Sequence, residues 1–440
     1  MVAGGTWQHG DPMKLFLVGA GHVGLVTAVG LAKLGHELTV ADIDARRIER
    51  LQAGEPPIYE PGLAEALVEF APRLRFTTDP TPPPGAAFSF VAVSTPTDTD
   101  GPLSLAHVRT VVRGLLETTG RGDTIVIRST LPLDGPAALA ALRAGRADAA
   151  SIVTNPEFMR EGSGIRDFER PGRMIAGWLE PRDEPAARAV LGIYAGIEAE
   201  TLVADAGSVA LIKVASNVYL AMKVAYANEV ARLSESIGAD ARAVADGIGL
   251  DVRIGRAFLD AGPGFGGSCL PEQAMALAID AAKRGVPTPL IDSIARSNRT
   301  HQAAIVDRVA TLLGGTVRGR RIAVFGLAFK ANTDDVRESP ALAIAALLRD
   351  AGAGVVGTDP RAERRAALAD PALEIVATPE EAAAKADAIV IATEWRDYAD
   401  LDWATIAAAM AGDLVFDTRS IADRAAVTAA GLRLVALGRG

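Results

Sequence analysis

Residues 14–24 read Lys14-Leu-Phe-Leu-Val-Gly-Ala-Gly-His-Val-Gly24, and this stretch decides the fold of the first half of the chain. The apolar run leads into three glycines, Gly19, Gly21 and Gly24, and a helical pattern follows over residues 25–34. A strand, a glycine turn and a helix in this order bind dinucleotide phosphates, because glycines let the backbone approach the pyrophosphate and the helix N-terminus attracts its charge. We therefore predict a Rossmann-like dinucleotide-binding unit whose ordered structure starts near Met13.

The next strand indicates which dinucleotide binds. Residues 37–41 form an apolar run, and Asp42 stands at its end, about 20 residues after the glycines. A carboxylate at this place accepts the ribose hydroxyls and repels a 2′-phosphate, which favours NAD over NADP, although Arg46 and Arg47 follow closely. His22 is expected to pack beside the cofactor rather than to act as a base. A structural tight turn without a ligand is the alternative.

Two further apolar strands, residues 87–93 and 123–127, each end in a short polar loop. These loops read Ser94-Thr95-Pro96-Thr97 and Arg128-Ser129-Thr130. Doubly wound sheets bind ligands at the carboxyl ends of their strands, so we expect both loops to line the crevice at the glycine turn. Ordinary turns are the alternative.

A long helix and a second sheet follow. No Gly or Pro interrupts the 30 residues between Gly207 and Gly238, which predicts a helix of roughly 45 Å. Lys213 and Asn217 lie four residues apart on one face of it, among apolar neighbours; a solvated lysine and a surface asparagine are the alternative. The predicted strands of the second sheet cover residues 321–325, 355–359, 388–392 and 414–417, with a helix from Ser339 onward.

The second sheet lacks the full glycine triplet, so we expect it to hold a different ligand. Lys330 and Arg337 lie in the loop that leaves its first strand, and both are candidates for phosphate contacts. An ion pair with Asp334 or Asp335 is the alternative.

The chain's single cysteine ends the segment Gly262-Pro-Gly-Phe-Gly-Gly-Ser-Cys269. Leu270 and Pro271 then begin a predicted helix, with proline in its first turn. A thiol at a helix N-terminus has a lowered pKa, which favours the nucleophilic thiolate. A buried and inert cysteine is the alternative.

Composition limits the classes of protein. The chain has 440 residues, 49% of them apolar, and a net charge of -9, which argues against a nucleic-acid surface. One cysteine excludes an internal disulfide framework, and the five scattered histidines indicate no metal site. The sequence shows neither a signal-peptide pattern nor an apolar run long enough for a membrane span. We expect a cytoplasmic protein.

From about Met13 to Arg439 the chain resembles the nucleotide-sugar dehydrogenases of the UDP-glucose and GDP-mannose 6-dehydrogenase family. The matching segments are Gly19-Ala-Gly-His-Val-Gly-Leu-Val26, Ile58-Tyr-Glu-Pro-Gly-Leu63, Ser94-Thr-Pro-Thr97, Asn155-Pro-Glu-Phe-Met-Arg-Glu-Gly-Ser163, Gly262 to Cys269, and Gly326-Leu-Ala-Phe-Lys-Ala-Asn-Thr-Asp-Asp-Val-Arg-Glu-Ser-Pro340. The segment 155–163 is most similar to the UDP-glucose branch.

This resemblance implies an α/β fold with two Rossmann-like doubly wound domains joined by a long central helix. The expected domains are an NAD-binding domain over residues 13–205, a central helical and dimerisation region over 206–300, and a nucleotide-sugar-binding domain over 318–440. The implied substrate is a UDP-sugar, with UDP-glucose first, and the implied assembly is a homodimer. No nucleic-acid or membrane partner is implied.

The implied reaction oxidises the sugar C6 hydroxyl to a carboxylate with two NAD in turn, through a thiohemiacetal and a thioester on Cys269. The resemblance assigns catalytic roles to Cys269, Lys213, Asn217, Glu161, Glu157 and Thr130, and Glu272 and Gln273 are further catalytic candidates because they directly follow the cysteine's first helical turn. Cofactor contacts are assigned to Gly19, Gly21, His22, Val23, Gly24, Asp42, Arg47, Ser94, Thr95, Pro96, Thr130 and Arg337. Substrate contacts are assigned to Phe158, Met159, Arg160, Glu161, Lys213, Asn217, Phe265, Gly266, Phe329, Lys330, Arg419 and, from the partner subunit of the dimer, Arg253.

Two positions after the cysteine depart from the family pattern, because Glu272 and Gln273 stand where the family has Lys and Asp. One hypothesis is that Glu272 reaches the place of the missing aspartate, which leaves a working oxidase. A second is an enzyme that is impaired after the first hydride transfer, and a third is a protein that binds nucleotide sugar without oxidising it. Two-electron hydroxyacid or sugar-phosphate dehydrogenases are a rival class, and they need no cysteine.

Overall fold

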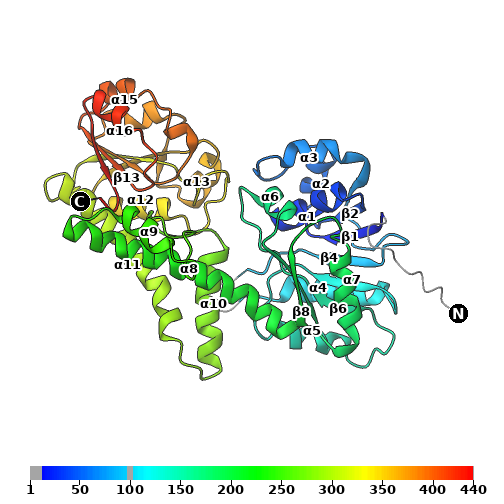
Figure 1. The fold of residues 1–440 in the computed structure, drawn as a ribbon. Coiled ribbons are helices and arrows are strands. Elements are labelled where there is room, and N and C mark those ends of the chain that lie inside the picture. Colours follow the sequence, from blue (N-terminus) through cyan, green and yellow to red (C-terminus); the bar gives the residue numbers. More distant parts are fainter. Residues whose placement is uncertain (1–11, 97–102, 440) are drawn as a thin grey trace. The chain divides into compact units, whose positions relative to one another are not determined.

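The structure is a computed structural model that describes residues 12–96 and 103–439 (Figure 1). The chain divides into two compact units, Met1–Ser216 and Asn217–Gly440, which we call unit 1 and unit 2. Most of the segment before Met13, and Thr97 of the predicted polar loop, lie outside the described residues.

Eight strands in the described part of unit 1 form one sheet with the order β3-β2-β1-β4-β5-β6-β7-β8. All neighbours pair in parallel except β6 and β7, which are antiparallel. The strands are β1 (Lys14–Val18), β2 (Glu37–Ala41), β3 (Leu74–Thr77), β4 (Phe88–Val91), β5 (Thr124–Ile127), β6 (Ser151–Thr154), β7 (Arg173–Trp178) and β8 (Glu200–Asp205). The first six have the strand order of a doubly wound dinucleotide-binding sheet, as predicted.

Side chains of β1 alternate between two cores because successive residues of a strand face opposite sides of the sheet. Leu15 and Leu17 pack with α1, α3, α6 and α7, whereas Phe16 and Val18 pack with α4 and α5. The helices of unit 1 are α1 (His22–Lys33), α2 (Ala45–Gln52), α3 (Leu63–Glu69), α4 (Ala106–Thr118), α5 (Gly135–Arg143), α6 (Gly164–Glu169) and α7 (Glu184–Gly192), with short 3-10 helices at Ala71–Arg73 and Pro181–Asp183.

The sheet of unit 2 repeats this arrangement. Its described strands have the order β11-β10-β9-β12-β13-β14 and are all parallel. They are β9 (Arg321–Phe325), β10 (Gly354–Thr358), β11 (Glu374–Ile375), β12 (Ala388–Ile391), β13 (Leu414–Asp417) and β14 (Arg433–Ala436). The prediction of a second, related sheet is therefore confirmed.

The helices of unit 2 surround that sheet or precede it in the chain. They are α9 (Ala241–Gly249), α10 (Cys269–Lys283), α11 (Pro289–Leu312), α12 (Pro340–Asp350), α13 (Glu363–Ala369), α14 (Pro379–Ala383), α15 (Trp403–Ala409) and α16 (Arg424–Ala429), with a 3-10 helix at Arg396–Tyr398. The predicted helix after Ser339 is α12, and the Ser339 hydroxyl caps it by accepting a hydrogen bond from Leu342 N.

The predicted long helix is α8, which spans Ala206–Ile237 and continues from unit 1 into unit 2. Among the described helices it is the one whose length and apolar composition also suit a membrane span. Those properties alone are weak evidence for a span, because core helices of soluble proteins share them. Lys213, Asn217 and Asn228 of α8 are buried within the protein and hydrogen-bonded there.

One predicted boundary was wrong by a full turn of helix. Helix α1 begins at His22 rather than near residue 25, with Gly21 as its N-cap residue. His22 therefore belongs to the first turn of α1, and Gly24 lies inside the helix. A Cβ atom at Gly24 would overlap the carbonyl oxygen of Gly19, so this glycine serves close packing of the helix against the turn.

Candidate active site

The glycine turn, residues 19–24, lies at the carboxyl end of β1. Gly19 has a φ of +107°, a conformation that favours glycine, and a Cβ there would overlap the backbone of Ala92. At Gly21, by contrast, a Cβ would meet no atom within 4 Å, so the turn opens to space on that side. The turn can accept a close ligand over the N-terminus of α1, as a pyrophosphate requires.

Asp42 is held firmly at the end of β2. Its Oδ2 atom accepts hydrogen bonds from Ala20 N at 2.7 Å and from Arg47 Nη1 at 2.9 Å, and its Oδ1 accepts one from Asp44 N at 2.9 Å. A carboxylate has about four acceptor positions, so one on Oδ1 remains for a ribose hydroxyl. The predicted Asp42 and Arg47 are thus together beside the glycine turn, and the set fits NAD.

The two polar loops lie beside the turn because β4 pairs with β1 and β5 pairs with β4, all in parallel. Ser94 leads into Thr95 and Pro96, and its hydroxyl contacts Nδ1 of His107 at 3.2 Å. Ser129 donates a hydrogen bond to the Val93 carbonyl at 2.6 Å and so joins the second loop to the first. Thr130 follows, half-buried. The structure thus brings the described parts of the two loops together at the carboxyl ends of these strands.

Glu157 and Lys213 form a buried ion pair. Lys213 Nζ lies 2.9 Å from Oε1 of Glu157 and also donates to the Glu157 carbonyl at 2.5 Å, while Met159 N donates to Oε2 at 2.6 Å. Burial alone would raise the pKa of Glu157, but the Lys213 charge and these hydrogen bonds lower the pKa below its ordinary value. Lys213 is therefore buried, and the alternative of a solvated lysine is excluded.

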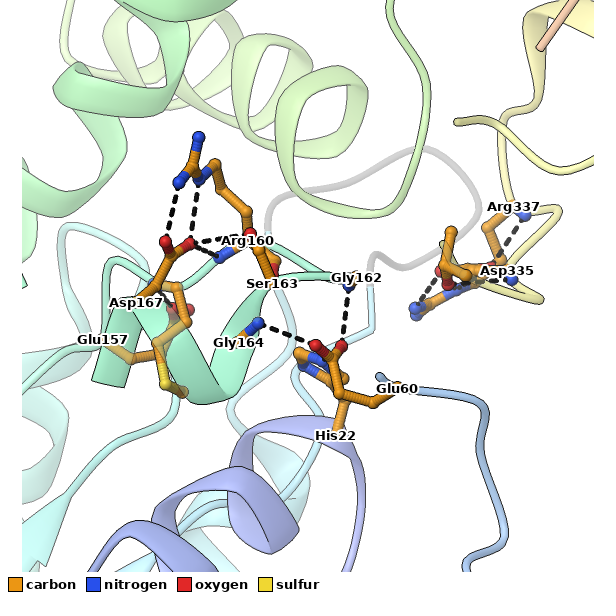
Figure 2. Close-up of polar contacts among 12 residues, drawn as sticks. His22, Glu60, Glu157, Arg160, Gly162, Ser163, Gly164, Asp167, Asp335 and Arg337 are labelled. Carbon is orange, nitrogen blue, oxygen red and sulfur yellow. Dashed lines mark hydrogen bonds and ion pairs between the residues drawn. The ribbon is translucent and has the colours of Figure 1, made fainter. Parts of the chain in front are cut away.

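The neighbouring residues form a loop over 157–164 that enters α6. The Arg173 guanidinium lies 4.0 Å from the Phe158 ring centroid, and Lys213 Nζ lies 5.2 Å from it. Arg160 forms a two-point ion pair with Asp167, at 2.8 and 2.6 Å, so its predicted availability to a substrate is reduced (Figure 2). Met159 packs against the core, and Glu161 is half-buried between Arg160 and Gly162.

Cys269 is the first residue of α10, and its side chain is exposed. It ends the cysteine loop, residues 262–269, which three buried polar side chains hold. Asn228 Oδ1 accepts from Gly262 N at 2.9 Å, His301 Nε2 donates to the Gly262 carbonyl at 2.7 Å, and Asn298 bonds both backbone groups of Phe265 at 3.0 Å. Sequence reasoning missed these three residues because each lies far from the loop in the chain. The predictions of an exposed thiol and of a helix start are confirmed.

Asn217 and Gln273 contact each other inside unit 2. Asn217 Nδ2 donates to Oε1 of Gln273 at 2.9 Å, and both side chains are buried. Glu272 is half-buried, and its charged neighbours are Arg337, Glu338 and Asp335. Burial is the main cause that raises the pKa of Glu272. The charge of Arg337 lowers this pKa, whereas the charges of Glu338 and Asp335 raise it further. It is thus residue 273, and not Glu272, that meets Asn217.

The loop after β9 packs against the cysteine loop. A Cβ at Gly266 would overlap the Glu338 carbonyl, and one at Gly267 would lie 2.9 Å from the Phe329 ring. Gly267 N donates to the Arg337 carbonyl at 3.0 Å. Gly266 and Phe329, two predicted substrate contacts from distant segments of the chain, therefore lie next to each other.

The candidate phosphate ligands differ in their surroundings. Arg337 forms an ion pair with Asp335 at 2.5 Å (Figure 2). This ion pair is the one that the sequence offered as the alternative to a phosphate contact. Lys330 Nζ lies 5.5 Å from the Phe329 ring centroid. Arg419 Nε lies 2.9 Å from Oε2 of Glu394, and its guanidinium lies beside Gly262, where a Cβ would come within 2.9 Å of Nη1.

Arg253 stands apart from these residues. Its side chain is 85% exposed and pairs with Asp251 at 2.6 Å. Within unit 2 it contacts none of the other predicted site residues through a described hydrogen bond or ion pair. An exposed position agrees with, but does not test, a contact made in a neighbouring subunit.

Three family models match the chain in sequence order. They are the NAD binding domain of the UDP-glucose/GDP-mannose dehydrogenase family over residues 13–197, its central domain over 208–300 and its UDP binding domain over 323–424.

Relatives match nearly the whole chain. The chain is 38% identical to a UDP-glucose 6-dehydrogenase of Rhizobium meliloti over 436 residues, which is 97% of this chain and 100% of that protein. It is 36% identical to the UDP-glucose 6-dehydrogenase YwqF of Bacillus subtilis, with 97% and 98% covered. The solved structure of a UDP-glucose dehydrogenase from Pyrobaculum islandicum superposes with a TM-score of 0.84 at 35% identity, with 96% of this chain and 97% of that chain covered. The chain therefore belongs to the UDP-glucose/GDP-mannose dehydrogenase family.

Proposed function

We propose that the protein oxidises the C6 hydroxyl of UDP-glucose to a carboxylate and forms two NADH for each sugar. The observation that carries this proposal is the exposed Cys269 thiol, which the N-terminus of α10 and a firmly held glycine-rich loop present. The UDP binding domain and the named relatives support the substrate. Impaired oxidation and mere binding are the less favoured alternatives, because no relative named above is described in those terms.

The cysteine accounts for the second oxidation. Removal of a hydride and a proton from the C6 alcohol gives an aldehyde, and the Cys269 sulfur then forms a bond to the aldehyde carbon. The resulting thiohemiacetal loses a second hydride and a proton to become a thioester, which water cleaves to the carboxylic acid and the free thiol. NAD, held at Gly19, Gly21 and Asp42, supplies the hydride acceptor in both oxidations.

The residues of unit 1 supply charge and proton transfer in this proposal. Lys213, kept in place by buried Glu157, stabilises the oxygen that becomes negative at C6. Glu161 moves the proton, and Glu157 and Thr130 hold the attacking water. A buried pair suits this task, because burial strengthens the field of the ammonium group.

The residues of unit 2 supply the nucleophile and the nucleotide contacts. Asn217 donates a hydrogen bond to the reacting oxygen, and Gln273 fixes the orientation of the Asn217 amide. Phe329, Lys330 and Arg419 contact the nucleotide end of the substrate. Phe329 and Arg419 lie beside the cysteine loop, and the Lys330 ammonium lies over the Phe329 ring, which suits this role.

We also propose the three domains 13–205, 206–300 and 318–440 and a soluble, cytoplasmic homodimer. The ranges of the three family models support the domain order. Tyr219, Tyr226 and Leu233 support the dimer, because these exposed apolar side chains recur every seven residues along one face of α8. Leu250 and Val252 are exposed beside Arg253, which supports a contact of that arginine with the partner subunit's substrate.

Purified protein with limiting UDP-glucose and excess NAD tests the proposed reaction. Two NADH per sugar with unmodified protein afterwards is the expected result. One NADH per enzyme with a sugar adduct on Cys269 would point to impaired release, and no NADH would point to binding alone. A parallel series with other UDP- and GDP-sugars tests the substrate.

A further inference from the structure

The Glu60 carboxylate joins two parts of unit 1 that are distant in sequence (Figure 2). Its side chain is wholly buried, at 0% exposure. Oε1 accepts a hydrogen bond from Gly164 N at 2.8 Å, and Oε2 accepts one from Gly162 N at 2.7 Å and one from His22 Nε2 at 2.6 Å. A buried carboxylate requires such donors, since desolvation without them is costly. Here the donors come from the 157–164 loop and from the first turn of α1.

Glycines allow this close approach. Gly162 has a φ of +77°, which turns the backbone so that the amides of residues 162 and 164 both point at one carboxylate. A Cβ at Gly164 would lie 3.3 Å from the His22 ring, and one at Gly30 would overlap the ring of Phe168 in α6. The loop and α6 are therefore packed directly against α1.

His22 carries the charge that suits this contact. Burial lowers the pKa of His22, but the hydrogen bond to Glu60 and the charges of Glu161, Glu60 and Glu157 outweigh it and raise the pKa above its ordinary value. The carboxylates that face His22 thus come from the loop before α3 and from the 157–164 loop. The contact therefore favours the imidazolium form of His22 opposite the Glu60 carboxylate.

We propose that Glu60 is a positioning residue that holds the 157–164 loop, and with it Glu161, against the first turn of α1. Glu161 directly precedes the Gly162 amide that Glu60 binds, so release of this amide frees the backbone that carries Glu161. His22 belongs both to the contact and to the glycine turn, and therefore nucleotide bound at the turn orders the loop. The catalytic role of Glu161 rests on the proposed function, whereas the connection that Glu60 makes between the 157–164 loop and α1 does not.

The substitution Glu60→Gln separates the carboxylate's role from its bulk. A glutamine retains one oxygen and replaces the other by an NH₂ group, which faces a backbone N–H in either orientation. Gly162 N or Gly164 N then loses its acceptor while the shape of the side chain stays the same. Glu65→Gln is a matched control, because Glu65 is exposed in the nearby α3 and loses the same charge.

Hydrogen exchange in the full-length protein tests the link without a sugar. In a peptide spanning residues 159–166, Glu60→Gln should exchange about tenfold faster than wild type, which corresponds to the loss of one hydrogen bond. Glu65→Gln should match wild type, and a peptide from β10 should be unchanged in all three proteins. If the 159–166 peptide of Glu60→Gln exchanges at the same rate as in wild type, the proposal is wrong.

A second variant tests the connection to the cofactor turn. NAD should slow exchange of the 159–166 peptide in wild type but not in His22→Leu, when each protein is saturated with NAD as its own direct titration shows. Equal slowing in both proteins would overturn the role of His22.

Activity then links the proposal to catalysis: Glu60→Gln should lower kcat about tenfold and change KM for NAD less, and an unchanged kcat would contradict a positioning role. If wild type fails to oxidise UDP-glucose, the proposed function fails, while the exchange results still decide the link.

Discussion

Individual charges in this protein are held by neighbours whose positions the sequence does not reveal. Glu157 and Lys213 are separated by 56 residues yet form a buried pair. Removal of one member leaves a buried charge without a partner, so Lys213→Ala should lower the free energy of unfolding by about 3 kcal/mol. Urea titration measures this loss. Lys33→Ala, which breaks the exposed pair with Glu169, should change it by less than about 1 kcal/mol.

The same pair predicts a pH dependence. Because the folded pKa of Glu157 lies below its ordinary value of 4.5, the pair's contribution is complete above that value and is lost as the pH falls through the folded pKa. The stability difference between wild type and Glu157→Gln should therefore shrink below pH 4.5. A difference that stays constant down to the acid transition would contradict the assignment.

His22 predicts the opposite direction. Its folded pKa is raised above 6.5, so the stability from its pair with Glu60 is complete below 6.5 and is lost as the pH rises through the folded pKa. Wild type should exceed His22→Leu in free energy of unfolding most at mildly acidic pH, and the excess should decline in alkaline solution. An excess that grows with pH would show that His22 is neutral in the folded protein.

Substitutions of Glu272 and Gln273, which stand where the family has Lys and Asp, show which of the two residues takes part in catalysis. Gln273 contacts Asn217, so Gln273→Leu should lower kcat about tenfold through the lost hydrogen bond. Glu272 has Arg337, Glu338 and Asp335 as its charged neighbours, so Glu272→Gln should still form two NADH per sugar. Loss of the second NADH in Glu272→Gln would instead support the hypothesis that Glu272 fills the aspartate's place.

At the scale of elements, the cysteine loop depends on close packing more than on its own flexibility. Gly264 has a φ of +122°, and a Cβ there would lie 2.6 Å from Oδ1 of Asn298. Gly264→Ala should therefore displace the loop and lower kcat. Labelling of Cys269 by a thiol reagent should become slower or proceed in more than one phase. Gly285→Ala is the control, since Gly285 has a φ of +69° but open space around it. Similar behaviour of the two variants would contradict the packing argument.

Elements with a strong periodic pattern were predictable. Strands β2, β9 and β13 have the predicted bounds, and α8 begins only two residues before its predicted start. The start of α1 was missed because Gly24, which looks like part of a continuing loop, lies inside the helix. The supports of the site, such as Asn298 and Glu60, could not be predicted, because long-range contacts and not local propensity select them.

At the scale of the whole molecule, the exposed apolar face of α8 predicts self-association. Tyr219, Tyr226 and Leu233 are 54%, 53% and 62% exposed. If they form the dimer contact, Tyr226→Asp should yield monomers in sedimentation velocity while circular dichroism remains unchanged. Val68→Asp, at an exposed apolar residue of unit 1, is the control and should stay dimeric. A monomeric wild type, or a dimeric Tyr226→Asp, would contradict the proposed face.

In the proposed reaction, Cys269 carries the sugar through the second oxidation. NADH formed per UDP-glucose, measured together with the mass of the intact protein, tests it most directly. Wild type should give two NADH and end unmodified, whereas Cys269→Ala should give neither a second NADH nor any adduct. Two NADH per sugar from Cys269→Ala would contradict the account.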